Sequence, residues 1–223
     1  MRLNTQALLA LLVSFLGMES AMAIEEPHYD VLTSQAPFEL RYYSPVLIAQ
    51  TIVEGDMDTA SSRGFRLIAD FIFGNNNSSG LNPNPQASSD QSAKIAMTAP
   101  VTLEPQSSKI DMTAPVTIEP QLGNSQQWRV PFVMPSQYTL ANIPKPNNSA
   151  VTLHELPSKY VVVHRYSGFN TLARVQEKTD GALAWAEQQS LKIVGTPQLS
   201  RYDPPWTLPM FRRNEIMIEV AEP

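Results

Sequence analysis

The sequence contains no cysteine, and this absence excludes several kinds of protein at once. Disulfide bonds, thiolate catalysis and cysteine-ligated metal sites all need that side chain, so the fold must be held together by packing alone. Only three histidines are present, and none lies four residues from another. We therefore expect no clustered zinc or di-iron site.

Catalytic motifs and clustered positive charge are also missing. There is no G-x-S-x-G nucleophile elbow and no glycine-rich phosphate loop, and the carboxylates are scattered without a pattern that selects a pair. The formal net charge is -5, and no run of basic residues provides the clustered Lys and Arg that phosphate binding requires. We expect a binding protein rather than an enzyme, with no nucleic-acid partner.

No apolar run is long enough to span a bilayer, which takes about 20 residues, but the first residues resemble an export signal. Arg2 provides a positive start, residues 7–16 are apolar apart from Ser14, and Ala21-Met22-Ala23 matches a cleavage box. This pattern predicts a signal peptide over residues 1–23. The mature domain, residues 24–223, is then expected to be periplasmic or extracellular, with no stable membrane span left.

Strand and helix patterns alternate along the rest of the chain. Residues 38–53 are rich in β-branched and aromatic side chains, which predicts strands interrupted near Ser44-Pro45. A helix is expected over 57–73, with Asp56 as its N-cap, Gly74 just beyond its end, and an apolar face formed by Phe65, Ile68, Ala69 and Ile72. Further strands are expected over 128–134, 151–156, 160–166, 198–202 and 215–220. A second helix is expected over about 171–189, with one face formed by Leu172, Val175, Thr179, Ala182, Leu183 and Ala186.

A tandem repeat follows a polar stretch in the middle of the chain. Residues 94–106 (KIAMTAPVTLEPQ) and 109–121 (KIDMTAPVTIEPQ) differ at only two positions, and alternate residues in each copy are apolar. This period of two predicts a half-buried strand for each copy, with a hairpin between them. Residues 74–93, rich in Asn, Ser and Pro, are expected to form a mobile loop.

The two halves of the chain share one order, strands, helix, strands. The simplest interpretation is a single α+β domain with internal pseudo-twofold symmetry, in which each helix covers one face of a twisted or closed sheet. Methionines 97, 112, 134, 210 and 217 are expected to fill the core, and Trp128, Trp185 and Trp206 to anchor packing.

Six segments together resemble the SOUL/haem-binding-protein family, and they occur in the family's order. They are FELRYYSP (38–45), KIAMTAPV (94–101), WRVPFVMPSQY (128–138), PKPNNSAV (144–151), VVVHRYSG (161–168) and RYDPPWTLPMFRRNEIMIEV (201–220). The resemblance implies a distorted antiparallel β-barrel with two α-helices, built from two pseudo-twofold-related halves. It also implies non-covalent binding of haem or another tetrapyrrole, by a non-enzymatic carrier or buffer in the cell envelope.

The resemblance further implies which residues bind. In one branch of the family a histidine of the FELRYYSP-like strand is the proposed haem ligand, and the matching residue here is Tyr42, which as a tyrosine can ligate ferric haem. Another proposed site is an apolar groove beside the first helix, with a basic residue near each end for the propionates. In this chain that groove corresponds to Arg63, Phe65, Arg66, Ile68 and Phe71.

Several alternatives remain open at this point. His28, in the arm that precedes the first strand, can cap an open haem face, and Arg212 and Arg213 can grip carboxylates or form a salt bridge with Glu215. By resemblance to bacterial drug-sensing domains, the ligand can instead be another hydrophobic small molecule. A third hypothesis is a structural or partner-binding envelope protein whose doubled repeat strand exposes a sheet edge.

Overall fold

The computed structural model describes residues 24–78, 92–105, 127–204 and 206–223. The expected signal peptide, the second repeat copy, the hairpin between the copies and most of the expected mobile loop lie outside these residues. Their predictions therefore remain predictions.

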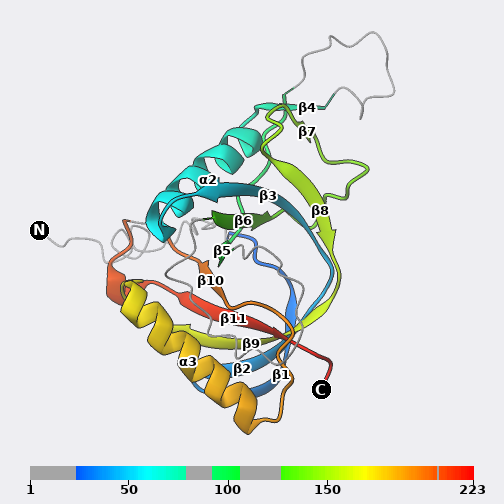
Figure 1. Cartoon of the computed structure of the whole chain (residues 1–223). Helices are drawn as coiled ribbons and strands as arrows, with labels where there is room; N and C mark the ends of the chain where they lie inside the picture. Colours follow the sequence, from blue (N-terminus) through cyan, green and yellow to red (C-terminus); the bar gives the residue numbers. More distant parts are fainter. Residues whose placement is uncertain (1–23, 79–91, 106–126, 205) are drawn as a thin grey trace, which may run out of the picture.

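A curled antiparallel sheet of nine strands forms the centre of the described domain (Figure 1). In spatial order its strands are β1 (Tyr29–Gln35), β2 (Phe38–Tyr43), β9 (Lys159–Tyr166), β11 (Asn214–Val220), β10 (Gln198–Arg201), β5 (Val101–Pro105), β6 (Gln127–Val133), β3 (Val46–Glu54) and β8 (Thr152–Leu156). Two helices, α2 (Met57–Ile72) and α3 (Leu172–Gln188), pack on the sheet, and the short strands β4 (Asn76–Asn77) and β7 (Lys145–Pro146) form a separate pair. The predicted fold class is confirmed, with a half-barrel that keeps β1 and β8 as its two edges.

The two halves are related by connectivity. The first half runs β3, α2, β5, β6 and the second runs β9, α3, β10, β11; in both, the last strand lies between the other two. Strands β5 and β10 meet at the centre, where Leu103 lies opposite Leu199. The strand that precedes each half pairs with a strand of the other half. Strand β2, which precedes β3, pairs with β9, and β8, which precedes β9, pairs with β3.

Helix α2 begins and ends where the sequence predicts. The Asp56 carboxylate accepts hydrogen bonds from the backbone N–H groups of Asp58 and Thr59, and Gly74 follows the last turn with a φ of +127°. Ile68, Ala69 and Ile72 of the predicted apolar face are buried, but Phe65 is 38% exposed and Gly64 lies against β6 instead. A Cβ on Gly64 would lie 2.7 Å from the side chain of Val130, so glycine is what allows this close approach.

Helix α3 covers the other half of the same face of the sheet. The Thr171 hydroxyl accepts a hydrogen bond from the backbone N–H of Arg174 at its start, and its buried residues pack on β9 and β11. These buried residues are Val175, Thr179, Ala182, Trp185 and Ala186, which confirms most of the predicted face. Leu172, predicted to be part of that face, is 51% exposed.

The first repeat copy is a strand only in its second part. Residues 92–100 have no strand structure apart from a bridge between Thr98 and Glu25, and β5 begins at Val101. The Ile95 and Ala99 N–H groups bond instead to the carbonyls of Ile72 and Glu25, and Pro100 has no N–H to offer. The predicted strand over the whole copy is therefore wrong for its first half, although Ile95, Ala99 and Leu103 are buried as expected.

The face of the sheet opposite the helices lines the inside of the curl and carries charged side chains. On β9, burial lowers the pKa of the Lys159 ammonium, and the charges that act on it include Glu219, Glu104 and Arg129. Glu104 and Arg129 stand on β5 and β6, which β11 and β10 separate from β9 along the sheet. The curl therefore brings distant strands towards one another. No helix within the described ranges is long and apolar enough to cross a membrane.

Candidate ligand-binding site

A buried ion pair between the two halves of the sequence is the strongest electrostatic feature of the described domain. Arg41 on β2 is 1% exposed and donates to both carboxylate oxygens of Glu215 on β11, at 2.9 and 3.1 Å. It also donates to Glu39 at 2.6 Å and to the Tyr43 hydroxyl at 3.0 Å. Buried charges are tolerated when they are paired and fully hydrogen-bonded, and Arg41 meets that condition.

A second arginine joins the same carboxylate from the other side. The Arg213 guanidinium donates to Glu215 at 2.9 Å, lies 3.7 Å from the centre of the Tyr202 ring and pairs with Glu26 at 2.9 Å. The Tyr202 hydroxyl donates to Glu215 at 2.7 Å. The salt bridge between Arg213 and Glu215 expected as one alternative from the sequence is therefore confirmed.

These contacts set the protonation states of Glu215 and Tyr202. Burial alone would raise the pKa of the Glu215 carboxyl, but the hydrogen bonds from Arg41 and Tyr202 and the charge of Arg213 hold it below its ordinary value. Burial raises the pKa of the Tyr202 hydroxyl, and the negative charge of Glu215 raises it further. Near neutral pH the carboxylate is thus ionised and the tyrosine neutral, which fits a structural clamp better than a proton-transferring pair.

The clamp, by which we mean Glu215 with Arg41, Arg213 and Tyr202, also fixes the N-terminal arm. We define this arm as residues 25–28. Glu26 is tied to Arg213, and the Glu25 carboxylate accepts a hydrogen bond from the Ser136 N–H at 2.8 Å. The Glu25 carbonyl accepts a hydrogen bond from the Ala99 N–H at 3.0 Å. The arm is therefore attached to three separate segments of the domain.

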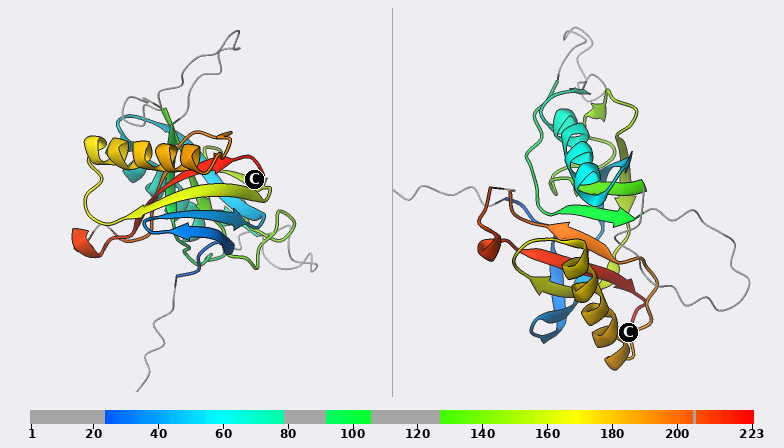
Figure 2. Two further views of the ribbon diagram at one scale, coloured as in Figure 1. Left: turned by 90° about the horizontal axis from the view of Figure 1, so that it is seen from below. Right: turned by 60° about the vertical axis from the view of Figure 1, so that its left-hand side comes forward.

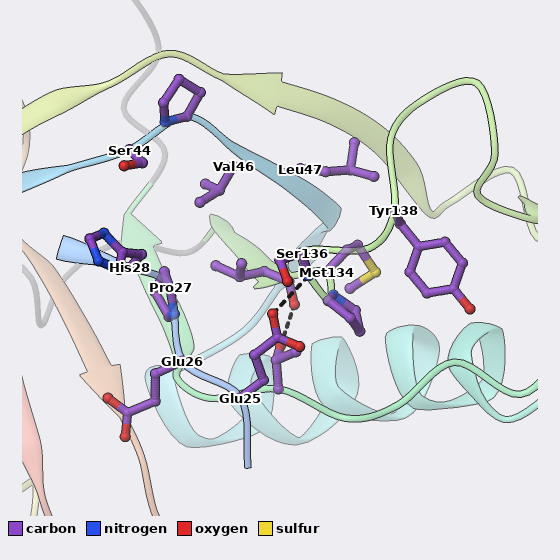
Figure 3. Close-up of a pocket in the computed structure, with 14 residues that line it drawn as sticks. Glu25, Glu26, Pro27, His28, Ser44, Val46, Leu47, Met134, Ser136 and Tyr138 are labelled. Carbon is purple, nitrogen blue, oxygen red and sulfur yellow. Dashed lines mark hydrogen bonds between the residues drawn. The ribbon is translucent and has the colours of Figure 1, made fainter. Parts of the chain in front are cut away.

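A cavity of about 310 Å³, which we call the arm pocket, lies between this arm and the sheet (Figure 3). Its walls come from the arm, from the β2–β3 turn with the start of β3, from Thr98 before β5, and from the end of β6 with the chain that follows it. They are Glu25, Glu26, Pro27, His28, Ser44, Pro45, Val46, Leu47, Thr98, Val133, Met134, Pro135, Ser136 and Tyr138. The volume is at the lower end of the range for small-molecule sites.

The charge and size of the arm pocket fit poorly with burial of a whole haem. Its charged wall residues are Glu25 and Glu26, whose carboxylates repel propionates, and its volume is small for a macrocycle. His28 is exposed at the wall and is an imidazole that can ligate iron. Among the described residues, no group of three or more His, Cys, Asp or Glu is arranged to hold a metal ion.

The six residues that the resemblance implied lie in three different environments. Ile68 and Phe71 are 0% and 1% exposed, so they support the core under α2 and offer no surface to a ligand. Arg63, Phe65 and Arg66 are exposed along α2, with the Phe65 ring centre 5.8 Å from that of Phe132. None of the six lines the arm pocket.

The sixth residue, Tyr42, lies on β2, in the part of the sheet that α3 covers. It pairs with Asp30 and Tyr160 in the sheet, and its ring centre lies 5.1 Å from that of Tyr160. Helix α2 packs instead on β3, β5 and β6. The structure therefore places Tyr42 and the α2 residues on different halves of the sheet.

A second exposed surface lies beside α2 and was missed by the sequence analysis. In the loop between β10 and β11, Trp206 is 81% exposed and Met210 is 66% exposed, although both were predicted to pack inside. Arg201, the last residue of β10, donates to Ser61 and Asp58 of α2, so this loop starts next to the helix (Figure 1). The prolines of the loop are the sequence feature that could have predicted this exposure, because proline disfavours the strand pairing that would bury the side chains.

Comparison with known proteins decides the family. The model of the SOUL heme-binding protein family matches residues 24–219, which is nearly the whole described domain. The chain belongs to the SOUL heme-binding protein family. No curated protein matches the sequence significantly.

Solved structures with the same fold as this SOUL domain are distant in sequence. The C-terminal domain of EcmrR is 11% identical, with a TM-score of 0.55 over 87% of this chain and 99% of that one. A hydrolase from Listeria innocua is 11% identical, with a TM-score of 0.52 over 85% of this chain and 94% of that one. An uncharacterized conserved protein from Listeria innocua is 12% identical, with a TM-score of 0.53 over 82% and 92%. At these identities the likeness concerns the fold alone.

Proposed function

We propose that the protein binds haem or a related tetrapyrrole without a covalent bond, as a carrier or buffer rather than an enzyme. Membership of the SOUL heme-binding family over residues 24–219 supports the ligand class. The observation that carries the site is the exposed surface of α2, on which Arg63, Phe65 and Arg66 are all accessible.

This surface suits the two kinds of chemistry that a haem presents. The macrocycle is flat and apolar, and it can lie against the exposed ring of Phe65. The propionates are carboxylates, and the guanidinium groups of Arg63 and Arg66 can hold them with two hydrogen bonds each. When bound, the haem supplies the iron and its redox chemistry, and the protein supplies shape and charge.

A role without catalysis is supported by the way the buried acid is used. Two arginines and a tyrosine donate hydrogen bonds to Glu215 and keep its carboxylate ionised, so it stabilises the fold and does not transfer protons. We further propose that the protein is exported and acts in the cell envelope, on the strength of the signal pattern in residues 1–23.

Haem titration of the purified protein tests the ligand. We expect a shifted Soret band and quenching of tryptophan emission at micromolar haem. The double variant R63A/R66A is expected to bind at least about a hundredfold more weakly, because each of the two lost charge-assisted contacts contributes about 1.5–3 kcal/mol. R165A/K192A removes the same charge from exposed positions elsewhere and serves as the matched control.

The same titration separates the candidate sites. Loss of affinity in H28A, with H154A as the control for an exposed histidine outside the pocket, would place the haem at the arm pocket instead. A changed spectrum in Y42F would assign iron ligation to Tyr42. A wild-type protein with neither a Soret shift nor quenching would refute haem binding altogether.

The arm pocket favours a second candidate function, the binding of a small hydrophobic molecule. Its lining includes the apolar side chains of Val46, Leu47, Val133 and Met134, together with the Tyr138 ring and Glu25. A thermal-shift screen of neutral and cationic hydrophobic compounds against haem tests this, because the ligand that binds the folded state most tightly stabilises it most. Stabilisation by a compound that M134A and Y138A abolish, while R63A/R66A keeps it, would establish the pocket as a separate site.

A further inference from the structure

Large apolar side chains gather on one protruding part of the surface. Phe169, Leu172, Trp206, Leu208, Met210 and Phe211 are each more than half exposed, and we call this set the apolar tip. Trp206 and Phe211 reach 81% and 71% exposure. Single exposed apolar residues are ordinary, but a cluster of this kind on a folded domain marks an interaction surface.

The apolar tip is built by two loops that hydrogen bonds hold together. The Gly168 N–H donates to the Pro209 carbonyl at 2.8 Å, which joins the loop before α3 to the loop before β11. The Phe211 N–H donates to the Leu208 carbonyl at 2.9 Å and closes the short helix η2 (Pro209–Phe211). The side chains are therefore presented on a backbone that is already ordered.

The shape of the tip favours a flat partner surface over a peptide. The segment with η2 stands out from the body of the domain in both views of Figure 2. A projecting segment can insert into the boundary between the headgroups and acyl chains of a bilayer, where Trp and other amphipathic rings are favoured.

Two arginines lie beside the tip. The Arg212 guanidinium lies 5.9 Å from the Phe169 ring centre, and the Arg174 guanidinium donates to the Ser167 carbonyl at 3.1 Å. The acidic side chains of this region are already engaged, because the Asp203 carboxylate accepts a hydrogen bond from the Arg213 N–H at 2.6 Å and Glu26 is paired with Arg213. Two guanidinium groups at the edge of an apolar surface complement an anionic lipid surface, although the chain as a whole is acidic.

The path of the chain leads to the same conclusion. Glu26 is bound to Arg213, next to Arg212, so the polypeptide enters the domain beside the tip. The apolar stretch of the expected signal ends at Leu16, and ten extended residues reach at most about 35 Å. While that stretch is held in a membrane, the tip is within reach of the same bilayer.

We infer that the apolar tip docks on an anionic lipid bilayer, with Trp206 and Phe211 inserted among the headgroups and Arg174 and Arg212 at the lipid phosphates. This inference does not depend on haem binding, since it concerns the protein without ligand. The competing occupant is a second copy of the chain, which the test distinguishes.

Tryptophan fluorescence makes the test specific, because Trp128 and Trp185 are 0% and 3% exposed and Trp206 is 81% exposed. We expect a blue shift of the emission on adding vesicles of phosphatidylglycerol and phosphatidylcholine, and quenching by brominated acyl chains. The shift should be smaller with phosphatidylcholine alone and with added salt. In W206F the shift should vanish while co-sedimentation with vesicles remains.

Variants assign the binding to the tip. L208S/F211S should lower vesicle affinity about tenfold or more while Trp206 remains as reporter, because two buried apolar side chains are lost. I193S/V194S removes two exposed apolar residues beyond the other end of α3 and should bind as the wild type does. Equal thermal melts of the variants show that the fold is intact.

Two results would overturn the inference. One is the absence of any vesicle-dependent change in emission and sedimentation for the wild-type protein. The other is a blue shift that follows protein concentration without lipid, together with a dimer in analytical ultracentrifugation that L208S/F211S abolishes, which would assign the tip to a second copy.

Discussion

Arg41 and Glu215 lie 174 positions apart in the sequence and form a two-point ion pair inside the curl of the sheet. Their strands, β2 and β11, are not neighbours, because β9 lies between them. The pair therefore connects the first and last parts of the described domain across an intervening strand. Both residues belong to segments that carry the family resemblance, FELRYYSP and RYDPPWTLPMFRRNEIMIEV.

Removing one partner of this pair should lower the free energy of unfolding substantially. R41A leaves the buried Glu215 carboxylate with one arginine fewer, and breaking a buried pair typically costs about 3–5 kcal/mol. The free energy of unfolding from urea titration measures the loss. R201A breaks the partly exposed contact with Asp58 and should cost less than about 1 kcal/mol. Equal losses in the two variants would contradict the assigned role of the buried pair.

Acid should destabilise the protein through Glu215. Its pKa is lower in the folded state than the ordinary 4.5, so the stabilisation is present above pH 4.5 and is lost as the pH falls through the folded value. Unfolding free energies measured from pH 6 downwards should therefore fall steeply below about 4.5. The slope should be smaller in E215Q, and an unchanged slope would assign acid sensitivity to other carboxylates.

His164 adds a second pH effect at higher pH. Its ring is buried on β9 against Phe38, with Nδ1 2.8 Å from the Lys178 carbonyl, and burial lowers its pKa below 6.5. The folded state thus binds a proton less readily than the unfolded one, so stability should decline as the pH falls below 6.5. H164Q should flatten this part of the curve, whereas H154Q, at an exposed position, should leave it as it is.

Gly64 should not tolerate a larger residue, although it lies within a helix. Alanine would improve helix propensity by about 1 kcal/mol, but its Cβ would lie 2.7 Å from the side chain of Val130. Overpacking of this kind costs about 1–3 kcal/mol. We expect G64A to unfold at lower urea concentration and G64A/V130A to recover part of the loss. A stabilised G64A would show that α2 can move away from β6.

The sequence predicted most strands and both helices because their patterns are local. Asp56, Gly74 and Thr171 mark helix ends through contacts with their immediate neighbours, which a sequence displays directly. On the buried side of α2, Ile68, Ala69 and Ile72 were predicted, whereas the contact at Gly64 was missed. That contact depends on Val130 of another strand, and hydrophobic periodicity gives no weight to glycine.

The site was harder to predict than the fold, for a physical reason. Ile68 and Phe71 look like ligand-lining residues in an apolar helix, yet the sheet already covers them. The arm pocket is formed by residues from four separate segments, and only the folded chain brings Glu25, Ser44, Thr98 and Tyr138 together. Exposure of Trp206 could not be inferred from residue type, since tryptophan is usually mostly buried.

The exchange of β2 and β8 between the halves has a consequence for how the domain can be divided. A fragment that ends before β8 would leave β3 without its partner β8 and β2 without its partner β9. The complementary fragment would leave β8 and β9 without β3 and β2. Neither piece could complete its own sheet, so a cut anywhere between residues 146 and 152 should yield two insoluble chains. The two similar halves therefore cannot fold as separate units, and the protein should melt in one step.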